Sequence, residues 1–309
     1  MPSRFFSGFR VILGSALTTL VVVPVFAAES PEMALPPPQR IVSLAPAITE
    51  TLFALGLGSR VVGVSSYCDQ PPEARKLPKV GTFTEPVAET IVSLKPDLVL
   101  TSPSPGNETA VRAIERSGVR VEVVQSEGGL AEARAAMLEV ARAAGDPEAG
   151  RRLLDGIDRR IDVVRERAKA LPPESVAVVV GREPLVLAGP GSYLGQLVTA
   201  AGGHNVADAV GGRWPRVGLE LLVVARPEVL LDLSVAMPGS AGTQEPPSEA
   251  ELAKAWAALE SVPAVAKGRI VADRASLLLR PGPRLGEAAE AIFSALHPEA
   301  SLPALPVAE

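Results

Sequence analysis

The fold is decided by the stretch Glu89-Thr-Ile-Val-Ser-Leu-Lys-Pro-Asp-Leu-Val-Leu100, because the chain contains its pattern twice. The second copy is Glu220-Leu-Leu-Val-Val-Ala-Arg-Pro-Glu-Val-Leu-Leu231. Each copy has an acidic residue, an apolar helical turn, a basic residue, a proline, a second acid and an apolar strand. Two ordinary helix-to-strand junctions could also match by chance. If the repeat is genuine, the chain folds into two equivalent lobes.

Strand and helix patterns alternate on both sides of this repeat. In the first half we expect strands at 40–44, 61–64, 98–101 and 119–124, and a helix at 47–55. In the second half we expect strands at 176–180, 229–231 and 269–272, and helices at 193–201 and 285–296. Alternating strands and helices build parallel sheets. The sequence therefore predicts an α/β protein with two Rossmann-like lobes, each containing a parallel sheet.

A long amphipathic helix is predicted between the two copies, over residues 146–171. Asp146 suits its N-cap, Pro147 its first turn and Pro172 its end. Its apolar residues recur every three or four positions, at Leu154, Ile157, Ile161, Val164, Ala168 and Leu171. At 1.5 Å per residue the helix is about 39 Å long, which suits one connector joining both lobes. An ordinary lobe helix or a dimerising coiled coil would give a similar pattern.

The N-terminal residues carry the pattern of a secretory signal peptide. Arg4 and Arg10 flank the start of an apolar run, and Val25-Phe26-Ala27 is a small-residue cleavage pattern. We therefore expect cleavage and a mature protein in the periplasm; an uncleaved membrane anchor is the alternative. The predicted organisation is a signal peptide at 1–27, an N-terminal lobe at 38–145, the connector helix at 146–171, a C-terminal lobe at 172–298 and a tail at 299–309.

The charge, cysteine and histidine content exclude several classes of function. Removal of residues 1–27 leaves 28 of the 30 basic residues and all 35 acidic residues, so the mature chain is acidic. An acidic chain is unsuited to nucleic acid and to anionic membrane surfaces. Cys68 has no partner for an intramolecular disulfide, and His204 and His297 are too few for a metal cluster. We expect no metal site, no prosthetic group and a monomer that is stable through its core.

One glycine-rich loop, Gly189-Pro-Gly-Ser-Tyr-Leu-Gly195, follows a strand and opens a helix, as a dinucleotide-binding loop does. Its spacing is one residue too long, and Pro190 removes an N–H group that a pyrophosphate would need. A structural turn at the helix entry is the favoured explanation. The sequence contains no nucleophile elbow, Walker loop or zinc-protease motif. We therefore predict that the protein is not an enzyme.

Five short motifs resemble one family of transport proteins. They are Arg40-Ile-Val-Ser-Leu-Ala-Pro46, Gly63-Val-Ser-Ser-Tyr-Cys-Asp69, Leu77-Pro-Lys-Val-Gly81, Ser93-Leu-Lys-Pro-Asp-Leu-Val99 and Arg280-Pro-Gly-Pro-Arg284. Together they resemble the periplasmic cobalamin-binding components of ABC importers, which are class III, helical-backbone substrate-binding proteins. The resemblance implies two Rossmann-like lobes joined by one long helix, with ligand in the cleft. It implies cobalamin or a related corrinoid as the transported ligand, and an ABC permease with its ATPase as partners.

The resemblance also assigns roles to individual residues. Glu89 and Glu220 correspond to the two glutamates that dock onto arginines of the permease; each could instead simply favour a helix N-terminus. Ligand contacts are implied for Tyr67, Phe83, Trp214 and Arg280. Aromatic faces and a forked donor suit the apolar faces and amide edges of a corrin ring. Packing of these side chains against the core is the alternative, and we expect Trp256 in the core.

Several positions depart from the family pattern. Ser102, Val180 and Ser276 stand where aromatic or acidic contacts are expected, which makes the predicted pocket less aromatic. Thr82 stands where heme-binding relatives place an iron-ligating tyrosine, which argues against heme.

Other functions stay open on the sequence. An iron-siderophore binder of the same fold is the main alternative, because an anionic chelate could be held by Arg182, Arg213, Arg216 and Arg280. A secreted dinucleotide-dependent oxidoreductase would use the loop at Gly189, and a sensor or scaffold would bind ligand without transport. Our prediction is capture of cobalamin or a related corrinoid in the periplasm for delivery to a permease.

Overall fold

Aliphatic stretches form the strands of the first sheet, because a parallel sheet is buried on both faces. The computed structural model describes residues 36–234, 248–273 and 276–304. Four parallel strands lie in the order β2-β1-β3-β4. Their bounds are β1 Ile41–Ser43, β2 Val61–Val64, β3 Leu98–Thr101 and β4 Arg120–Val123. Every residue of the inner strands β1 and β3 is buried. The parallel sheet expected in the first half is confirmed.

Helices of the first half follow the strands in alternation. They are α1 Pro46–Ala54, α2 Ala88–Ser93, α3 Glu108–Arg116 and α4 Leu130–Ala143, with short 3-10 turns at Gly58–Arg60 and Pro72–Lys76. α1 and α4 share a core cluster in which Leu52 of α1 and Val140 of α4 are buried. This cluster also contains Ile41 of β1, so both helices cover the same face of the sheet.

The second sheet is mixed, with strand order β10-β9-β5-β6-β8 and β7 paired to β5. Its strands are β5 Glu174–Arg182, β6 Leu185–Leu187, β7 Gly203–Asn205, β8 Arg216–Val217, β9 Val229–Asp232 and β10 Ile270–Ala272. β5 is parallel to β9, but β6 is antiparallel to both β5 and β8. Only Glu183 and Pro184 link β5 to β6, and so short a link joins strands as a hairpin. The fold class is confirmed, with the correction that this sheet is not wholly parallel.

Helices of the second half cover both faces of the mixed sheet. They are α5 Pro147–Ala168, α6 Tyr193–Ala200, α7 Glu220–Ala225, α8 Glu249–Trp256, α9 Pro263–Ala266 and α10 Leu285–Leu296, with 3-10 turns at Val206–Ala209 and Ala257–Leu259. Val178 of β5 faces a cluster with α5, α6 and α10, whereas Val179 faces a cluster that contains Leu222 of α7 and Trp256 of α8. Trp256 is buried, as expected.

Both copies of the sequence repeat form the same structure. α2 leads into β3 and α7 leads into β9, and each of these helices is six residues long. The basic residue before each proline adopts a left-handed backbone, with φ 49° at Lys95 and φ 48° at Arg226. β3 lies between β1 and β4, and β9 lies between β5 and β10. The match is therefore a structural equivalence and not a chance similarity of sequence.

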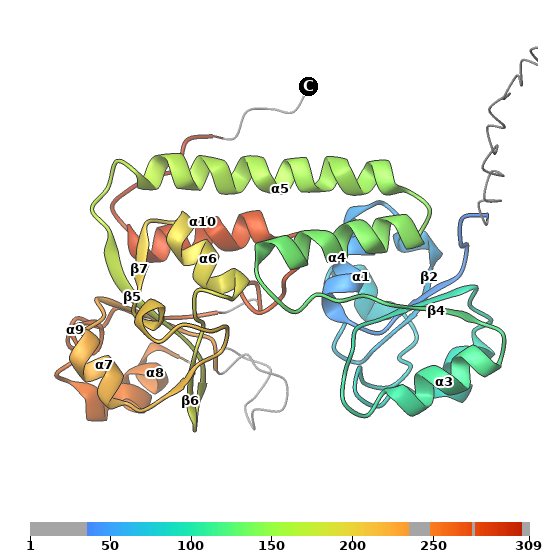
Figure 1. The fold of residues 1–309 in the computed structure, drawn as a ribbon, viewed down its shortest axis with the longest axis horizontal. Coiled ribbons are helices and arrows are strands. Elements are labelled where there is room, and N and C mark those ends of the chain that lie inside the picture. Colours follow the sequence, from blue (N-terminus) through green and yellow to red (C-terminus); the bar gives the residue numbers. More distant parts are fainter. Residues whose placement is uncertain (1–35, 235–247, 274–275, 305–309) are drawn as a thin grey trace, which may run out of the picture. The chain divides into compact units, whose positions relative to one another are not determined.

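The predicted connector helix is present as α5, although it ends three residues earlier than expected. Asp146 Oδ1 accepts a hydrogen bond from the backbone N–H of Ala149 at 2.9 Å, which confirms the N-cap. The buried residues of α5 include Leu154, Ile157, Ile161, Val164 and Ala168. α5 packs against α4 and α10, and Figure 1 shows it lying along both. Because its apolar face is covered within the chain, that face is not available for a dimerising coiled coil.

The halves of the chain are joined by more than the connector itself. The described residues from 37 onward form one compact unit, in which α4 from the first half and α10 from the second half both pack on α5. The guanidinium of Arg160 on α5 donates to both carboxylate oxygens of Glu290 on α10, at 2.8 and 2.7 Å. This bidentate pair adds a directional contact to the apolar packing between the two helices.

Parts of the predicted organisation are not addressed by this fold. The signal peptide at 1–27 lies outside the described residues, and so do residues 305–309 of the tail. The limits 38–145 and 172–298 of the two lobes stay predictions. Across the ranges that the structure describes, no helix combines the length and the apolar character needed to span a membrane.

Candidate ligand-binding site

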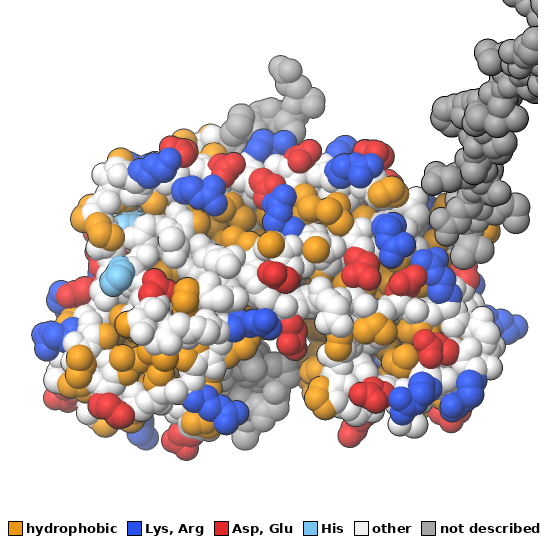
Figure 2. All heavy atoms as spheres, in the orientation of Figure 1, with side chains coloured by type: hydrophobic (Ala, Val, Ile, Leu, Met, Phe, Trp, Pro, Cys, Tyr) orange, Lys and Arg blue, Asp and Glu red, His pale blue; other side chains and the backbone are white. Residues whose placement is uncertain are grey.

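One residue predicted to contact ligand lies in a loop just beyond the carboxyl end of a strand. In α/β sheets, ligands bind beyond the carboxyl ends of the strands. The loop after β2 carries Tyr67, and the chain after β3 begins with Ser102. In the second sheet, β5 ends at Arg182 and β9 at Asp232. Figure 2 shows the surface hollowed between the two lobes, on the edge opposite α5.

Tyr67 and Phe83 form the first aromatic pair of the site. Their ring centroids lie 5.6 Å apart in an edge-to-face arrangement, and Tyr67 is 36% exposed. The two loops are tied together because the backbone N–H of Ser66 donates to the carbonyl of Gly81 at 2.8 Å. Asn107, which is buried, donates through Nδ2 to the carbonyl of Phe83 at 3.3 Å. The structure therefore brings two predicted contact residues together and holds their loops in place.

Trp214 and Tyr193 form a second pair in the other lobe. Their ring centroids are 6.4 Å apart and their planes are nearly perpendicular. Trp214 is 40% exposed, whereas Tyr193 is buried and donates its hydroxyl to the carbonyl of Leu278 at 2.7 Å. Burial raises the pKa of the Tyr193 hydroxyl well above its ordinary value, so it stays a neutral donor. The sequence predicted Tyr193 only as the first residue of a helix and not as part of the site. The available signal was an aromatic residue within the glycine-rich loop.

Arg280 lies at a contact between the lobes. Its Nη1 is 2.9 Å from Oε1 of Glu50 on α1 and 2.6 Å from Oδ1 of Asp69, two residues after Tyr67. Glu50 also accepts from Nε of Arg284 at 2.9 Å. The Arg280 side chain is 13% exposed. Burial opposes its charged form, but Asp69 and Glu50 outweigh this effect and raise the pKa of Arg280. Arg280 thus joins the loop that carries Tyr67 and Asp69 to the second lobe, a contact that the sequence did not reveal.

The second pair also lies beside a contact between the lobes. Arg213, the residue before Trp214, is 3.8 Å from the carboxylate of Glu127. The backbone N–H of Tyr193 donates to the carbonyl of Gly128 at 3.1 Å. Glu127 and Gly128 belong to the loop between β4 and α4. Each aromatic pair therefore lies near a point where the two lobes meet.

The four arginines that could hold an anionic chelate are not equivalent in the structure. Arg182 lies 2.7 Å from buried Asp232, Arg213 lies near Glu127, and Arg280 lies between two carboxylates. Arg216 is exposed on the edge strand β8. Within the described residues, three of these four guanidinium groups thus have a carboxylate partner. These carboxylates largely cancel the positive charge of the arginines, and an anionic chelate would need that charge to bind.

Comparison with known proteins assigns the family of the chain. A model of the periplasmic binding protein family matches residues 41–277. The chain belongs to the periplasmic binding protein family. The vitamin B12-binding protein of Vibrio cholerae serotype O1 is 26% identical over 260 residues, which is 84% of this chain and 90% of that protein.

Two solved structures place this periplasmic binding protein among relatives with different ligands. The periplasmic heme-binding protein RhuT from Roseiflexus sp. RS-1 has 31% identity and a TM-score of 0.69, covering 84% of this chain and 99% of that chain. The vitamin B12-binding protein BtuF of Vibrio cholerae has 26% identity and a TM-score of 0.64, covering 84% and 97%. The fold and family are shared with both relatives, so the ligand must be argued from the site.

The backbone of the glycine loop in this periplasmic binding protein makes its hydrogen bonds and close contacts within the chain itself. Ser192 caps α6, since its Oγ accepts from the backbone N–H of Gly195 at 3.0 Å. The N–H of Gly191 donates to the carbonyl of Gly212 at 3.0 Å. A β-carbon on Gly195 would come within 2.2 Å of the carbonyl oxygen of Gly189. The glycines therefore allow close backbone packing, which supports a structural turn rather than a dinucleotide site.

Glu89 and Glu220 lie on corresponding helices, α2 and α7, of the two lobes. Both side chains are exposed. Large apolar side chains are exposed beside them: Val87 precedes α2, and Leu219 and Val224 flank Glu220, with Val224 79% exposed. Exposed apolar residues around a charged group are typical of protein–protein interfaces. Glu220 thus has several exposed apolar neighbours, and Glu89 has one.

Three of the positions that depart from the family pattern make contacts with neighbouring residues of the chain. The hydroxyl of Thr82 lies 3.0 Å from that of Thr84. The carbonyl of Ser102 accepts from Asn107 at 3.0 Å, and Val180 packs against the core. Across the described ranges, no group of three or more His, Cys, Asp or Glu side chains could hold a metal ion.

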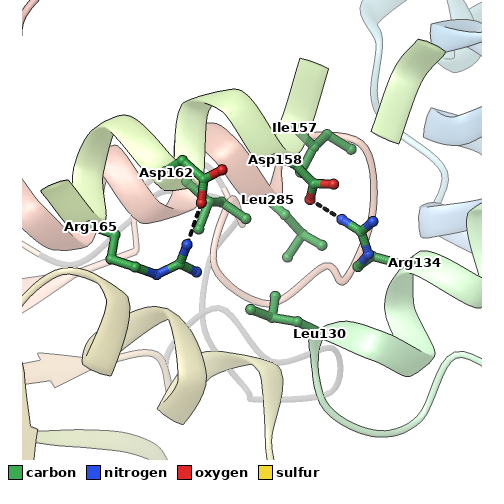
Figure 3. A pocket seen from close by; sticks show the side chains of 8 residues that line it. Leu130, Arg134, Ile157, Asp158, Asp162, Arg165 and Leu285 are labelled. Atoms are coloured by element: carbon green, nitrogen blue, oxygen red, sulfur yellow. Dashed lines mark hydrogen bonds and ion pairs between the residues drawn. The ribbon is translucent and has the colours of Figure 1, made fainter. Parts of the chain in front are cut away.

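A pocket away from the aromatic pairs opens where α4, α5 and the start of α10 meet. It has a volume of about 320 Å³. Figure 3 shows apolar Leu130, Ile157 and Leu285 around it, with the ion pair between Arg134 and Asp158 at its rim. None of the residues predicted to contact ligand lines it.

Cys68 is buried between the hydroxyl groups of Thr49 and Ser65, whose oxygens lie 3.1 and 3.2 Å from its sulfur. Burial raises the pKa of the Cys68 thiol, so less reactive thiolate is present. We expect iodoacetamide at mildly alkaline pH to leave the native protein unlabelled and to label it fully in denaturant, as followed by mass spectrometry. Rapid stoichiometric labelling of the native protein would contradict this.

Proposed function

We propose that this protein is the substrate-binding component of an ABC importer in the periplasm. It captures cobalamin or a related corrinoid between its lobes and delivers it to a permease and its ATPase. The observation that carries this proposal is the position of the two aromatic pairs, one in each lobe and each beside the inter-lobe junction. A corrin macrocycle offers broad apolar faces to such rings and amide groups to polar neighbours. The protein acts as a monomer, without catalysis or a prosthetic group.

Family membership and the named relatives support the proposal. Vitamin B12-binding relatives align with most of the chain, and they include a solved structure. A heme-binding relative aligns equally well, so heme is the ligand to exclude by experiment. Carboxylates already paired with Arg182, Arg213 and Arg280 favour an uncharged ligand over an anionic siderophore. The predicted signal peptide at 1–27 would bring the protein to the periplasm.

The proposed permease contact uses one acid from each lobe. Glu89 and Glu220 begin equivalent helix-to-strand junctions, so two structurally related surfaces are available to a permease with two-fold symmetry. Their carboxylates would pair with permease arginines, and the exposed Val87, Leu219 and Val224 would be covered in the complex.

Trp214→Ala tests the ligand assignment. We expect this variant to bind cyanocobalamin about 30-fold more weakly than the wild type, because it loses a large exposed ring at the site. Equilibrium dialysis of the mature protein, with heme and a ferric siderophore dialysed in parallel, gives the three affinities. The matched control is Val271→Ala, which also truncates an exposed apolar side chain but lies on β10, at the sheet edge opposite β8. Heme or siderophore binding without cobalamin binding would show that the proposed ligand is wrong.

A further inference from the structure

Four charged side chains form a closed cluster between the lobes. Glu50 on α1 is buried and contacts Arg280 through Oε1 at 2.9 Å and Arg284 through Oε2 at 2.9 Å. Asp69 approaches the same Nη1 of Arg280 at 2.6 Å and stays 48% exposed. The cluster contains two carboxylates and two guanidinium groups, so it has no net charge. It borders the ligand site, because Asp69 lies two residues after Tyr67.

Stability alone is a weak explanation for such a cluster. Moving charged groups out of water is costly, and a buried ion pair is often no more stabilising than well-packed apolar residues. Gly282, between the two arginines, already packs close to Ala47 of α1, so the lobes also meet there through backbone and apolar atoms. What the two carboxylates change most is the electrostatic potential that Arg280 presents to the neighbouring site.

We infer that Glu50 and Asp69 determine the charge selectivity of the site. By cancelling the charges of Arg280 and Arg284, they make the site favour an uncharged, amide-bearing ligand over one that carries free carboxylates. The inference rests on the proposed function, since it takes the junction between the aromatic pairs as the ligand site. It adds two residues, neither of them among the sequence-predicted contacts, and it states which ligand charge the site rejects.

A second arginine of the C-terminal lobe is also paired with a buried carboxylate. Asp232 is fully buried and accepts from Arg182 Nε at 3.0 Å, from Trp256 Nε1 at 2.8 Å and from Ser234 Oγ at 2.6 Å. Arg182, at the carboxyl end of β5, is therefore also neutralised by a fixed carboxylate. Charge cancellation both at the inter-lobe contact and at the end of β5 supports selection of an uncharged ligand.

The test compares two ligands that differ by one charge. Cyanocobalamin is neutral overall, and its monocarboxylic acid has one side-chain amide hydrolysed to a carboxylate. We expect the wild type to prefer the amide. Glu50→Gln and Asp69→Asn each expose positive charge, so each should shift the ratio of the two affinities about tenfold toward the acid. Isothermal titration calorimetry of the full mature protein gives both affinities for each variant.

The affinity ratio separates charge selection from structural damage. A loosened site weakens both ligands together and leaves the ratio unchanged, whereas loss of a cancelling charge changes the ratio. Glu73→Gln is the control, because Glu73 is an exposed acid in the same lobe, in the 3-10 turn that follows the Asp69 loop. Asp69 is partly exposed, so Asp69→Asn keeps the test valid if Glu50→Gln fails to fold.

Each outcome has one meaning. A ratio that shifts in the Glu50 or Asp69 variant, stays constant in the Glu73 variant and returns toward the wild-type value at high salt supports the inference. Binding of both corrinoids with one constant ratio across all variants overturns the inference and leaves the proposed function intact. Failure of both corrinoids to bind the folded wild type overturns the proposed function, and this inference with it.

Discussion

Charge reversal at both Glu89 and Glu220 is expected to reduce cobalamin delivery to the permease about 100-fold, because like charges placed against each other at an interface cost several kcal/mol. Cobalamin affinity should not change, since both acids are exposed on α2 and α7 rather than among the aromatic pairs. The measurement is transport of labelled cobalamin into vesicles that contain the permease and its ATPase. Either single Lys variant should retain part of the activity, because one lobe still docks.

A matched double variant distinguishes docking from a general effect of charge. Glu73→Lys combined with Glu299→Lys reverses one exposed acid in each half of the chain, and neither acid is on α2, on α7 or on α3, which packs against α2. We expect wild-type transport from this control. Full transport by the Glu89 and Glu220 double variant would remove both acids from the docking surface and would favour the view that they only stabilise helix N-termini.

Gly195→Ala is expected to destabilise the protein by about 3 kcal/mol or more, because the added methyl group overlaps backbone that cannot move independently. The new β-carbon would lie 2.2 Å from the carbonyl oxygen of Gly189. The control is Gly156→Ala in α5, where the only atom near the added β-carbon is an arginine nitrogen of Arg159 at 3.9 Å. That change should stabilise the protein by about 0.5–1 kcal/mol, because alanine favours a helix over glycine.

Urea unfolding measures both glycine substitutions. The midpoint should fall for Gly195→Ala and rise for Gly156→Ala, with slopes similar to that of the wild type. A Gly195→Ala protein as stable as the wild type would mean that α6 can move away from the loop before it, and the structural explanation of the glycine motif would be lost.

Elements with local signals could be predicted from the sequence. Asp146 and Pro147 mark the start of α5, and spacing alone gave its buried face. The strands Val61–Val64 and Leu98–Thr101 and the helix Leu285–Leu296 have the expected bounds. In each of these, the residues that define the pattern are neighbours in sequence, so propensity, capping and burial agree.

Features with a short local pattern, and features that depend on distant partners, could not be predicted. The hairpin of β5 and β6 was missed because β6 has only three residues, and its partner β8 has two. The sequence contained one sign of the role of Glu50, which is an acidic residue at a position of the helix where the spacing predicts a buried side chain. Its partner Arg280 is 230 positions away, and the pattern around neither residue identifies the other. Tyr67 and Trp214 were placed by family resemblance, not by any local rule.

The packing of α4, α5 and α10 has a thermodynamic consequence for capture. A movement of one lobe relative to the other must shear close-packed helix interfaces and strain the Arg160–Glu290 pair, so only small displacements are inexpensive. A protein with one dominant conformation pays no penalty for populating a rare binding-competent state. The measured affinity of such a protein for its ligand then depends on how well the ligand fits a preformed site. Substitutions in the ligand site should change the dissociation rate of the ligand more than its association rate.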